Sequence, residues 1–200
     1  MPLTFNPVFS PRLYAAILMV LLAGLSVHVN AADNDETALL ANMRSGGTVL
    51  MIRHALAPGT GDPDHFQLND CSTQRNLNDT GRQQARAIGD WLRARGITSA
   101  KIYSSQWCRC LETAKLLDLG AVTELPALNS FFERPQDREP NLSALRAFIR
   151  EQADPKQLTI LVTHQVTISG ITSQWTDSGH GKLIRQGADG QIELFGELSF

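Results

Sequence analysis

Residues 48–54 read TVLMIRH, an apolar, β-branched stretch that leads directly into Arg53 and His54. A second stretch of the same kind, residues 158–164 with the sequence LTILVTH, leads into His164. Apolar runs without polar alternation are typical of central strands in a parallel sheet, whose two faces are both covered. In such sheets the ligand site lies beyond the carboxyl ends of the strands. The sequence therefore predicts that both histidines belong to one site.

A third strand is predicted at residues 101–104, with a helix behind it that carries Arg109. Arginine presents a planar fork that matches two phosphate oxygens, so Arg53 and Arg109 are candidate phosphate ligands. A neutral imidazole can attack phosphorus from one ring nitrogen when a backbone carbonyl holds the other. We therefore predict His54 as the nucleophile and His164 as a hydrogen-bonding partner of the phosphoryl oxygens.

Each of these residues also has a structural interpretation. A single histidine at a strand end is more often a hydrogen-bonded structural group than a catalyst. Arg109 could pair with Glu112 on a solvated helix face. The phosphate interpretation is favoured because three predicted strand ends each deliver a residue suited to phosphate. His28, His65 and His180 lie in the N-terminal segment or in loops and are interpreted as exposed or unrelated to the site.

The remaining pattern predicts an α/β fold with three layers, α/β/α, around a mostly parallel sheet with an antiparallel strand. Thr80 and Gln83 fit a capping box at the start of one helix, and residues 188–190 (ADG) are typical of a hairpin turn. The predicted helices cover residues 35–44, 80–95, 107–117, 141–152 and a segment through Ile168 and Ile171, and the predicted strands cover residues 48–52, 101–104, 158–162, 182–185 and 191–195.

Residues 55–78 show no sustained periodicity, and PGTGDP at residues 58–63 is turn chemistry. A segment of this length without secondary structure inside a compact domain is usually functional. Because it leaves the sheet directly after His54, we predict that it forms part of the pocket wall. The alternative is a partner-binding surface of a structural envelope protein, but Phe66 and Leu68 are too few to form an apolar patch.

The first 31 residues differ from the rest of the chain. Arg12 is their only charge, residues 13–27 are almost wholly apolar, and residues 29–31 (VNA) fit a cleavage site. We predict a signal peptide over residues 1–31 and a single domain over residues 32–200. The alternative is an uncleaved membrane anchor, although the apolar stretch falls short of the ~20 residues that span a bilayer. Either interpretation places the domain in an extracytoplasmic compartment, periplasmic or secreted.

The composition narrows the class of protein further. The chain of 200 residues is 42% hydrophobic and 19% charged, as in an ordinary globular protein. The predicted domain has 17 basic and 20 acidic residues, a net charge of −3, which does not suggest a nucleic-acid partner. The three cysteines do not supply the four ligands of a zinc site, so no metal or cofactor is predicted. An oxidising compartment would allow Cys71 to pair with Cys108 or Cys110 and would leave one thiol over.

Four ordered motifs resemble those of the histidine phosphatase superfamily, which has a phosphoglycerate mutase-like fold. Residues 53–55 (RHA) resemble its Arg-His-Gly motif, with alanine in place of glycine. Residues 77–85 (LNDTGRQQA) resemble its Leu-Thr-x-x-Gly-x-x-Gln-Ala segment, and residues 104–114 (SSQWCRCLETA) its Ser-Ser-x-x-x-Arg-x-x-x-Thr-Ala pattern. Residues 162–164 (VTH) resemble the segment with its second histidine, and the whole resemblance covers about residues 47–175.

This resemblance implies a phosphatase that uses no metal. His54 would be phosphorylated, and Arg53, Arg109 and His164 would complete the phosphate pocket. The export signal and Ala55 are similar to a periplasmic branch of the superfamily that includes a lipopolysaccharide core heptose(II)-phosphate phosphatase.

The resemblance leaves the general acid open. Mutase-like members carry a glutamate shortly after a leucine, where this chain has Asn129, and phytase-like members carry an aspartate after the second histidine, where it has Gln165. Glu133 is the nearest candidate acid, with Asp137 and Glu139 behind it. Glu133 could equally be a surface residue paired with its neighbour Arg134.

We predict an exported phosphatase that acts on a phosphate monoester or phosphoramidate carried by a small molecule or a glycan. A mutase is less suited to this compartment, because it exchanges phosphate with cytosolic sugar phosphates. The alternative from another class is a catalytically silent module that binds a phosphorylated glycan or protein. Ala55 and the uncertain acid favour that module, whereas the presence of both histidines and both arginines argues against it. We expect no stable membrane insertion after signal cleavage, and the oligomeric state stays open.

Overall fold

The computed structural model describes Met1 and residues 31–152 and 156–200. The chain divides into two compact units, Met1–Glu36 and Thr37–Phe200, and the second unit contains the whole sheet. The signal peptide predicted over residues 1–31 falls almost entirely outside the described residues, which include only its two ends. Within the described ranges, no helix combines the length and the apolar character needed to cross a bilayer.

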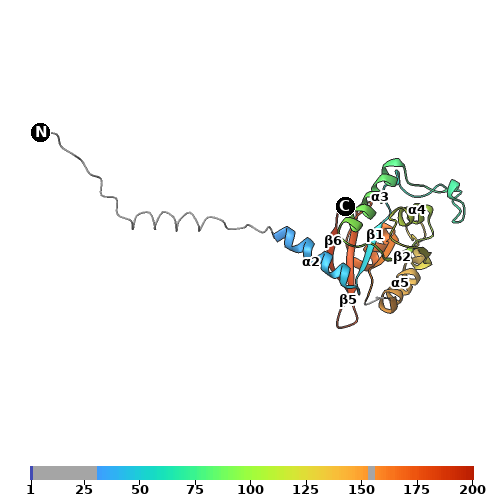
Figure 1. Cartoon of the computed structure of the whole chain (residues 1–200). Coiled ribbons are helices and arrows are strands. Elements are labelled where there is room, and N and C mark those ends of the chain that lie inside the picture. The colour runs from blue at the N-terminus through green and yellow to red at the C-terminus, as the bar shows by residue number, and fades with distance from the viewer. Residues whose placement is uncertain (2–30, 153–155) are drawn as a thin grey trace. The chain divides into compact units, whose positions relative to one another are not determined.

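Six strands form one sheet in the order β3-β2-β4-β1-β5-β6. Figure 1 labels β1, β2, β5 and β6 of this sheet. The four neighbours β3, β2, β4 and β1 pair in parallel, whereas β5 is antiparallel to both β1 and β6. The mostly parallel α/β sheet with an antiparallel strand is therefore confirmed, and β3 is the strand that the sequence did not predict. The strands are β1 (Val49–Arg53), β2 (Lys101–Ser104), β3 (Val122–Glu124), β4 (Thr159–Thr163), β5 (Gly181–Gln186) and β6 (Ile192–Leu198).

Helices cover both faces of this sheet because side chains alternate along each strand. Leu50 and Ile52 of β1 pack into one core with residues of α3 and α4, whereas Val49 and Met51 pack into a second core with residues of α5 and α6. The predicted three-layer arrangement is therefore confirmed. The α-helices in the described ranges are α2 (Ala31–Ser45), α3 (Asp79–Ala94), α4 (Cys108–Leu116), α5 (Arg138–Gln152) and α6 (Gln165–Thr172).

The carboxyl ends of the three central strands lie level with one another. Arg53 of β1 pairs with Thr163 of β4, so the histidine that follows each of them leaves the sheet at the same edge. Ser104, the last residue of β2, pairs with Val162 of β4, which brings Ser105 to that edge as well. The register of the sheet therefore assembles the predicted site.

Three helix starts differ from the prediction, and the first is that of α2, which begins at Ala31 instead of residue 35. Helix α3 is capped by Asn78, whose side chain accepts a hydrogen bond of 2.8 Å from the N–H of Gly81. Thr80 therefore lies inside the helix, and the predicted capping box is wrong; asparagine is a strong N-cap residue and stands two positions earlier. Helix α5 begins at Arg138 instead of residue 141, because the 3-10 turn Pro135–Asp137 leads directly into it.

Helix α3 packs closely against neighbouring backbone at two glycines. A Cβ at Gly81 would lie 2.0 Å from the carbonyl oxygen of Leu56, and one at Gly89 would lie 2.1 Å from that of Leu117. A Cβ atom cannot approach a carbonyl oxygen this closely. Glycine at these positions therefore lets α3 support both the segment after His54 and the end of α4.

Candidate active site

The strand ends open into a cavity of about 460 Å³ in the unit Thr37–Phe200. The structure brings all five predicted site residues to its wall, namely Arg53, His54, Arg109, Glu133 and His164. Other parts of the wall come from residues 59–64 and Phe66, from Ser130 and residues 132–134, and from Trp107 and Trp175. Their common placement is an observation, whereas their chemical roles stay predictions.

His54 follows β1 and is only 3% exposed. Its Nδ1 lies 2.8 Å from the carbonyl oxygen of Ala55. Because a carbonyl oxygen only accepts hydrogen bonds, Nδ1 carries the hydrogen and Nε2 keeps its lone pair. Burial, followed by the positive charge of Arg109, lowers the pKa of His54 to about 3. At neutral pH the ring is therefore uncharged, with Nε2 as its nucleophilic atom.

His164 follows β4 and is held from behind by the end of β2. Its Nε2 lies 2.9 Å from Oγ of Ser105, which in turn lies 3.1 Å from Oδ1 of Asn129. Burial and the charge of Arg109 lower the pKa of His164 well below its ordinary value. Since Ser105 engages Nε2, Nδ1 is the ring nitrogen left for a ligand. Asn129 stands where mutase-like members of the family carry a glutamate, and in this chain its side chain contacts the serine that holds His164.

The two predicted arginines reach the cavity from β1 and α4. Nη1 of Arg53 donates to the carbonyl oxygen of Thr176 at 3.0 Å, and its guanidinium lies 5.6 Å from the centre of the Trp175 ring. The side chain of Arg109 is 4% exposed and does not pair with Glu112. Glu112 instead lies 3.5 Å from an Nη of Arg82. The structural alternative considered for Arg109 is therefore wrong.

Two charged residues of the segment 55–78, called here the pocket loop, were not predicted as site residues. Asp62 accepts hydrogen bonds of 2.7 and 3.1 Å from Nη1 and Nη2 of Arg109. Burial raises the pKa of Asp62, but the hydrogen bonds and charge of Arg109 outweigh it and lower the pKa below its ordinary value. Arg75 lines the cavity and donates to the carbonyl oxygens of Gly61 and Ala57. The prediction that this loop forms a pocket wall agrees with this placement.

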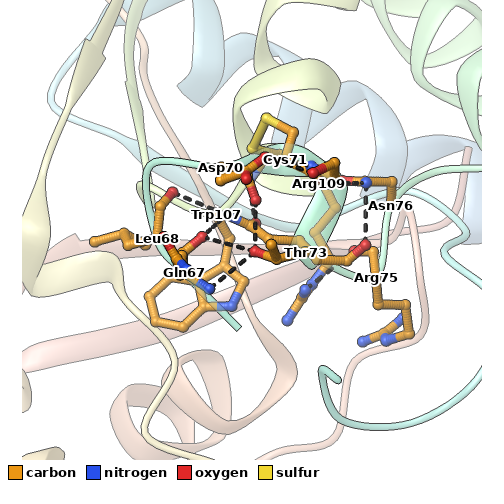
Figure 2. Close-up of a disulfide and its surroundings, with 12 residues drawn as sticks. Gln67, Leu68, Asp70, Cys71, Thr73, Arg75, Asn76, Trp107 and Arg109 are labelled. Atoms are coloured by element: carbon orange, nitrogen blue, oxygen red, sulfur yellow. Dashed lines mark hydrogen bonds between the residues drawn. A yellow bond between two sulfur atoms is a disulfide. The ribbon is translucent and has the colours of Figure 1, made fainter. Parts of the chain in front are cut away.

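A disulfide joins the pocket loop to the first residue of α4. Cys71 is bonded to Cys108, with 5.7 Å between their Cα atoms, and Figure 2 shows the bond beside Trp107 and Arg109. This settles the pairing that the sequence left open. Cys110 is the buried free thiol, and burial raises its pKa to about 12. The disulfide therefore ties the loop to the residue before Arg109.

Of the three candidate acids, only Glu133 lines the cavity. Its Oε1 accepts a hydrogen bond of 3.0 Å from the backbone N–H of Asp62, and its side chain is exposed. Asp137 lies in the 3-10 turn before α5, and Glu139 pairs with Arg138. Position therefore favours Glu133 as the proton donor among the three.

Alanine fits the position after His54 without strain. Ala55 is fully buried beside Ala57, Leu77 and Ala85, and its N–H donates to Oγ1 of Thr113 at 3.0 Å. Ala55 is not among the described residues other than glycine that have positive φ. The departure from Arg-His-Gly is therefore a packing adjustment that leaves the His54 backbone regular.

The other histidines that the structure describes, His65 and His180, do not extend the site, and His28 lies outside the described residues. His65 is exposed and His180 is partly buried, with its Nδ1 at 3.2 Å from Oγ of Ser199. Neither lines the cavity. In the part of the chain that the structure describes, no group of three or more His, Cys, Asp and Glu side chains is placed to hold a metal ion.

A family model of the histidine phosphatase superfamily (branch 1) matches residues 49–135, which include β1, the pocket loop and Arg109. None of the curated proteins matches the sequence. Many solved structures share the fold at low sequence identity. The segment that bears His164 lies beyond the residues that the family model matches.

Three of these solved structures illustrate the likeness. The protein histidine phosphatase SixA in complex with tungstate is 15% identical, with a TM-score of 0.54 over 76% of this chain and 96% of its own. A mycobacterial glucosyl-3-phosphoglycerate phosphatase in complex with VO3 is 16% identical, with a TM-score of 0.56 over 74% and 96%. A phosphoserine phosphatase mutant from Entamoeba histolytica is 14% identical, with a TM-score of 0.54 over 75% and 95%.

Proposed function

We propose that this chain, whose family match and fold support the histidine phosphatase superfamily, hydrolyses phosphate esters through a phosphohistidine on His54. The observation that carries the proposal is the hydrogen bond from Nδ1–H of His54 to the Ala55 carbonyl. This bond occupies Nδ1 and leaves the lone pair of Nε2 free, in a cavity lined by four arginines. A buried uncharged imidazole next to anion-binding groups is suited to attack phosphorus.

In the first step Nε2 of His54 forms a bond to phosphorus as the bond from phosphorus to the leaving group breaks. Arg53 and Arg109 bind the phosphoryl oxygens, on which negative charge is concentrated. Ser105 has one hydroxyl hydrogen, which either Oδ1 of Asn129 or Nε2 of His164 can accept. In the arrangement in which Nε2 accepts it, Nδ1 of His164 carries a hydrogen and donates to a third phosphoryl oxygen. The arginines supply positive charge that a metal ion provides in other phosphatases, so this step needs no metal.

Glu133 is proposed to protonate the departing alkoxide or amine. General acid assistance of this kind is typically worth ~10²–10⁴ in rate. In the second step a water molecule attacks phosphorus, the bond from phosphorus to His54 Nε2 breaks, and the water's proton passes to the Glu133 carboxylate. Inorganic phosphate leaves, and His54 returns to its uncharged form.

Export is the second part of the proposal. The apolar residues 13–27 and the VNA sequence at residues 29–31 support a cleaved signal peptide and a periplasmic or secreted domain. A disulfide between Cys71 and Cys108 is compatible with an oxidising compartment. This part is tested by N-terminal sequencing of the protein recovered from the periplasm, where a start at residue 32 is expected and retention of residues 1–31 would contradict it.

For the substrate we propose a phosphorylated sugar, with the lipopolysaccharide core heptose phosphates as the first to screen. The cavity rim exposes Phe132 and Trp175, which are 56% and 63% exposed and offer flat apolar surface to a ring. One of the similar structures is described as a glucosyl-3-phosphoglycerate phosphatase, and another as a protein histidine phosphatase. Phosphohistidine peptides therefore form the second class to screen.

The activity is tested with the purified mature chain and p-nitrophenyl phosphate, with a chelator present, beside His54→Ala and the control His65→Ala. We expect turnover by the wild type and the control, and none by His54→Ala. Wild-type enzyme quenched in alkaline denaturant, in which the phosphorus–nitrogen bond of phosphohistidine survives, should carry one phosphoryl group on the peptide that contains His54. Phosphate binding without turnover in every variant and on every substrate would contradict the proposal and indicate a binding module.

A further inference from the structure

Asp62 places a buried carboxylate against Arg109, one of the arginines that line the cavity. Its side chain is 6% exposed and accepts four hydrogen bonds, two on each oxygen. Oδ1 accepts from Nη1 of Arg109 and from the backbone N–H of Arg75, at 2.7 and 3.0 Å. Oδ2 accepts from Nε1 of Trp107 and from Nη2 of Arg109, at 2.9 and 3.1 Å. Both oxygens are therefore saturated by groups of the protein.

This saturation decides between two roles for the carboxylate. In the first role, Asp62 would occupy the phosphate position of Arg109 until substrate displaced it. Its departure would leave the indole N–H of Trp107 and the amide N–H of Arg75 without this acceptor. Buried donors that lose their partner destabilise the state in which they are left unpaired. The carboxylate is therefore a fixed part of the site, and substrate binds while it stays in place.

The pairing also selects which donors Arg109 offers to a ligand. Nη1 donates to Asp62 and to the carbonyl oxygen of Arg75, the latter at 3.2 Å. Nη2 uses one of its two hydrogens on Asp62, and Nε has no partner among the described residues. Hydrogens on Nε and Nη2 therefore remain, on the side of the guanidinium away from the carboxylate. A rigid planar fork with one side occupied has one orientation in which to bind phosphate.

Asp62 itself is held by contacts on both sides. Its backbone N–H donates to Glu133, and its loop is joined to α4 by the disulfide next to Arg109. The pocket loop contacts three consecutive residues of the α4 start: Phe66 stacks on Trp107 at 5.1 Å between ring centres, Gln74 accepts from the N–H of Cys108 at 2.9 Å, and Asp62 pairs with Arg109.

The charges of the cavity support the same role. The positive charges that act on His54 are those of Arg109, Arg75 and Arg53, and Asp62 pairs with the first of them. The wall also carries Arg134, Asp64 and Glu133, so its lining has four positive and three negative side chains. A neutral residue at position 62 would remove the partner that fixes the Arg109 guanidinium and leave this side chain free to adopt other rotamers.

We propose that Asp62 is the positioning residue of Arg109, and that the pocket loop exists to hold this carboxylate against α4. The proposal rests on the proposed phosphatase function for its kinetic consequence, but not for its effect on phosphate binding. Asp62 contacts no reacting atom. It acts by fixing the guanidinium that does.

The test compares Asp62→Ala and Asp62→Asn with Thr73→Ala, all in the full mature chain. Thr73 is the matched control because its buried hydroxyl bonds only within the loop, to Gln67 and Asp70. The dissociation constant for inorganic phosphate is measured by calorimetry, kcat and KM with p-nitrophenyl phosphate, and the unfolding temperature by circular dichroism. Ordering a long side chain on binding costs free energy, so freeing Arg109 should weaken phosphate binding about twofold to tenfold.

We expect both Asp62 variants to bind phosphate more weakly and to lose kcat as well as KM, with Asp62→Asn less affected because its amide oxygen still accepts. Thr73→Ala should lower the unfolding temperature and leave phosphate affinity unchanged. Phosphate affinity that is equal to or tighter than wild type in Asp62→Asn would overturn the proposal.

Folding and function are kept apart by two further comparisons. If Asp62→Ala does not fold, the near-isosteric Asp62→Asn decides the question alone. If the wild type shows no turnover at all, the proposed phosphatase function fails, but the phosphate affinities still test Asp62. If turnover depends on His54 while phosphate affinity ignores Asp62, only the role of Asp62 fails.

Discussion

The imidazole rings of His54 and His164 meet edge to face, with their centres 5.6 Å apart and their planes at 69°. Burial is the largest cause that lowers the pKa of each ring, and the charge of Arg109 is the second. Both rings are therefore uncharged at neutral pH. The pair combines a free base on one ring with a hydrogen-bonding group on the other, which is what attack on phosphorus requires.

The free energy of unfolding should fall as the pH falls below 6.5. His54 has an ordinary pKa of 6.5 in the unfolded chain and about 3 in the folded protein, so protons bind preferentially to the unfolded state. Its contribution is complete above pH 6.5 and is lost toward pH 3, at about 1.4 kcal/mol per pH unit. His164 shifts in the same direction and adds to the slope.

Urea unfolding between pH 7.5 and 5 measures this slope. The variant His54→Gln should reduce it by about one proton, whereas the exposed control His65→Gln should keep the wild-type slope. A stability that is constant across this range would contradict the burial of two uncharged histidines.

Removal of the disulfide should destabilise the domain and weaken phosphate binding together. The bond between Cys71 and Cys108 spans 37 residues, so chain entropy gives a loss of ~3–4 kcal/mol in the double variant Cys71→Ser/Cys108→Ser. Phosphate affinity should fall as well, because the loop that holds Asp62 loses its link to α4. Urea unfolding and calorimetry measure the two effects.

The pairing itself is checked by peptide mapping. Trypsin cleaves after Arg109 and so separates Cys108 from Cys110 into different peptides. The peptide with Cys71 should be linked to the one that ends at Arg109. A link to the peptide that begins at Cys110 would show that the disulfide is placed wrongly.

Phe132 should contribute to binding of the leaving group and not of the phosphate. It is exposed on the cavity rim, and ring contacts are worth ~0.5–1.5 kcal/mol. Phe132→Ala should therefore raise KM for p-nitrophenyl phosphate about twofold to tenfold and leave the dissociation constant of inorganic phosphate unchanged. Leu56→Ala, an exposed apolar control outside the cavity wall, should change neither quantity. An equal loss of phosphate affinity in Phe132→Ala would show that the ring supports the pocket instead.

Gly89→Ala should destabilise the protein although alanine is the better helix former. Inside an exposed helix this change would gain ~1 kcal/mol. Here the new Cβ would lie 2.1 Å from the carbonyl oxygen of Leu117, and overpacking of this kind costs ~1–3 kcal/mol. Chemical denaturation should show a net loss, while Gln83→Ala, on the exposed side of α3, should stay within ~0.5 kcal/mol of the wild type.

The elements with strong periodicity could be predicted from the sequence, and the short polar ones could not. The runs that become β1 and β4 are apolar at successive positions, residues 49–52 and 160–162, because both faces of a central strand are covered. Strand β3 has three residues, none of them buried, so it leaves no apolar signal. The start of α3 was misplaced because Asn78 and Thr80 both suit an N-cap, and only the structure shows which side chain bonds Gly81.

The site residues that directly follow a strand could be predicted from the sequence. The two histidines follow apolar runs, and the register of β1 with β4 brings them to one edge. Asp62 lies in a segment without periodicity and pairs with Arg109 across 47 positions of sequence, so no local pattern marked it. Acidic residues are common in turns, and only the burial of Asp62 against Arg109 distinguishes it from the others.

Four successive residues at the start of α4 face four different surroundings. Trp107 bonds the pocket loop, Cys108 forms the disulfide, Arg109 enters the cavity and Cys110 lies in the core. One residue more or less would turn every later side chain by about 100° around the helix axis. The Cys110 thiol would then point into the cavity, or the Arg109 guanidinium would point into the apolar core. This stretch therefore resists insertions and deletions more strongly than substitutions, and related chains should keep its length even where its letters differ.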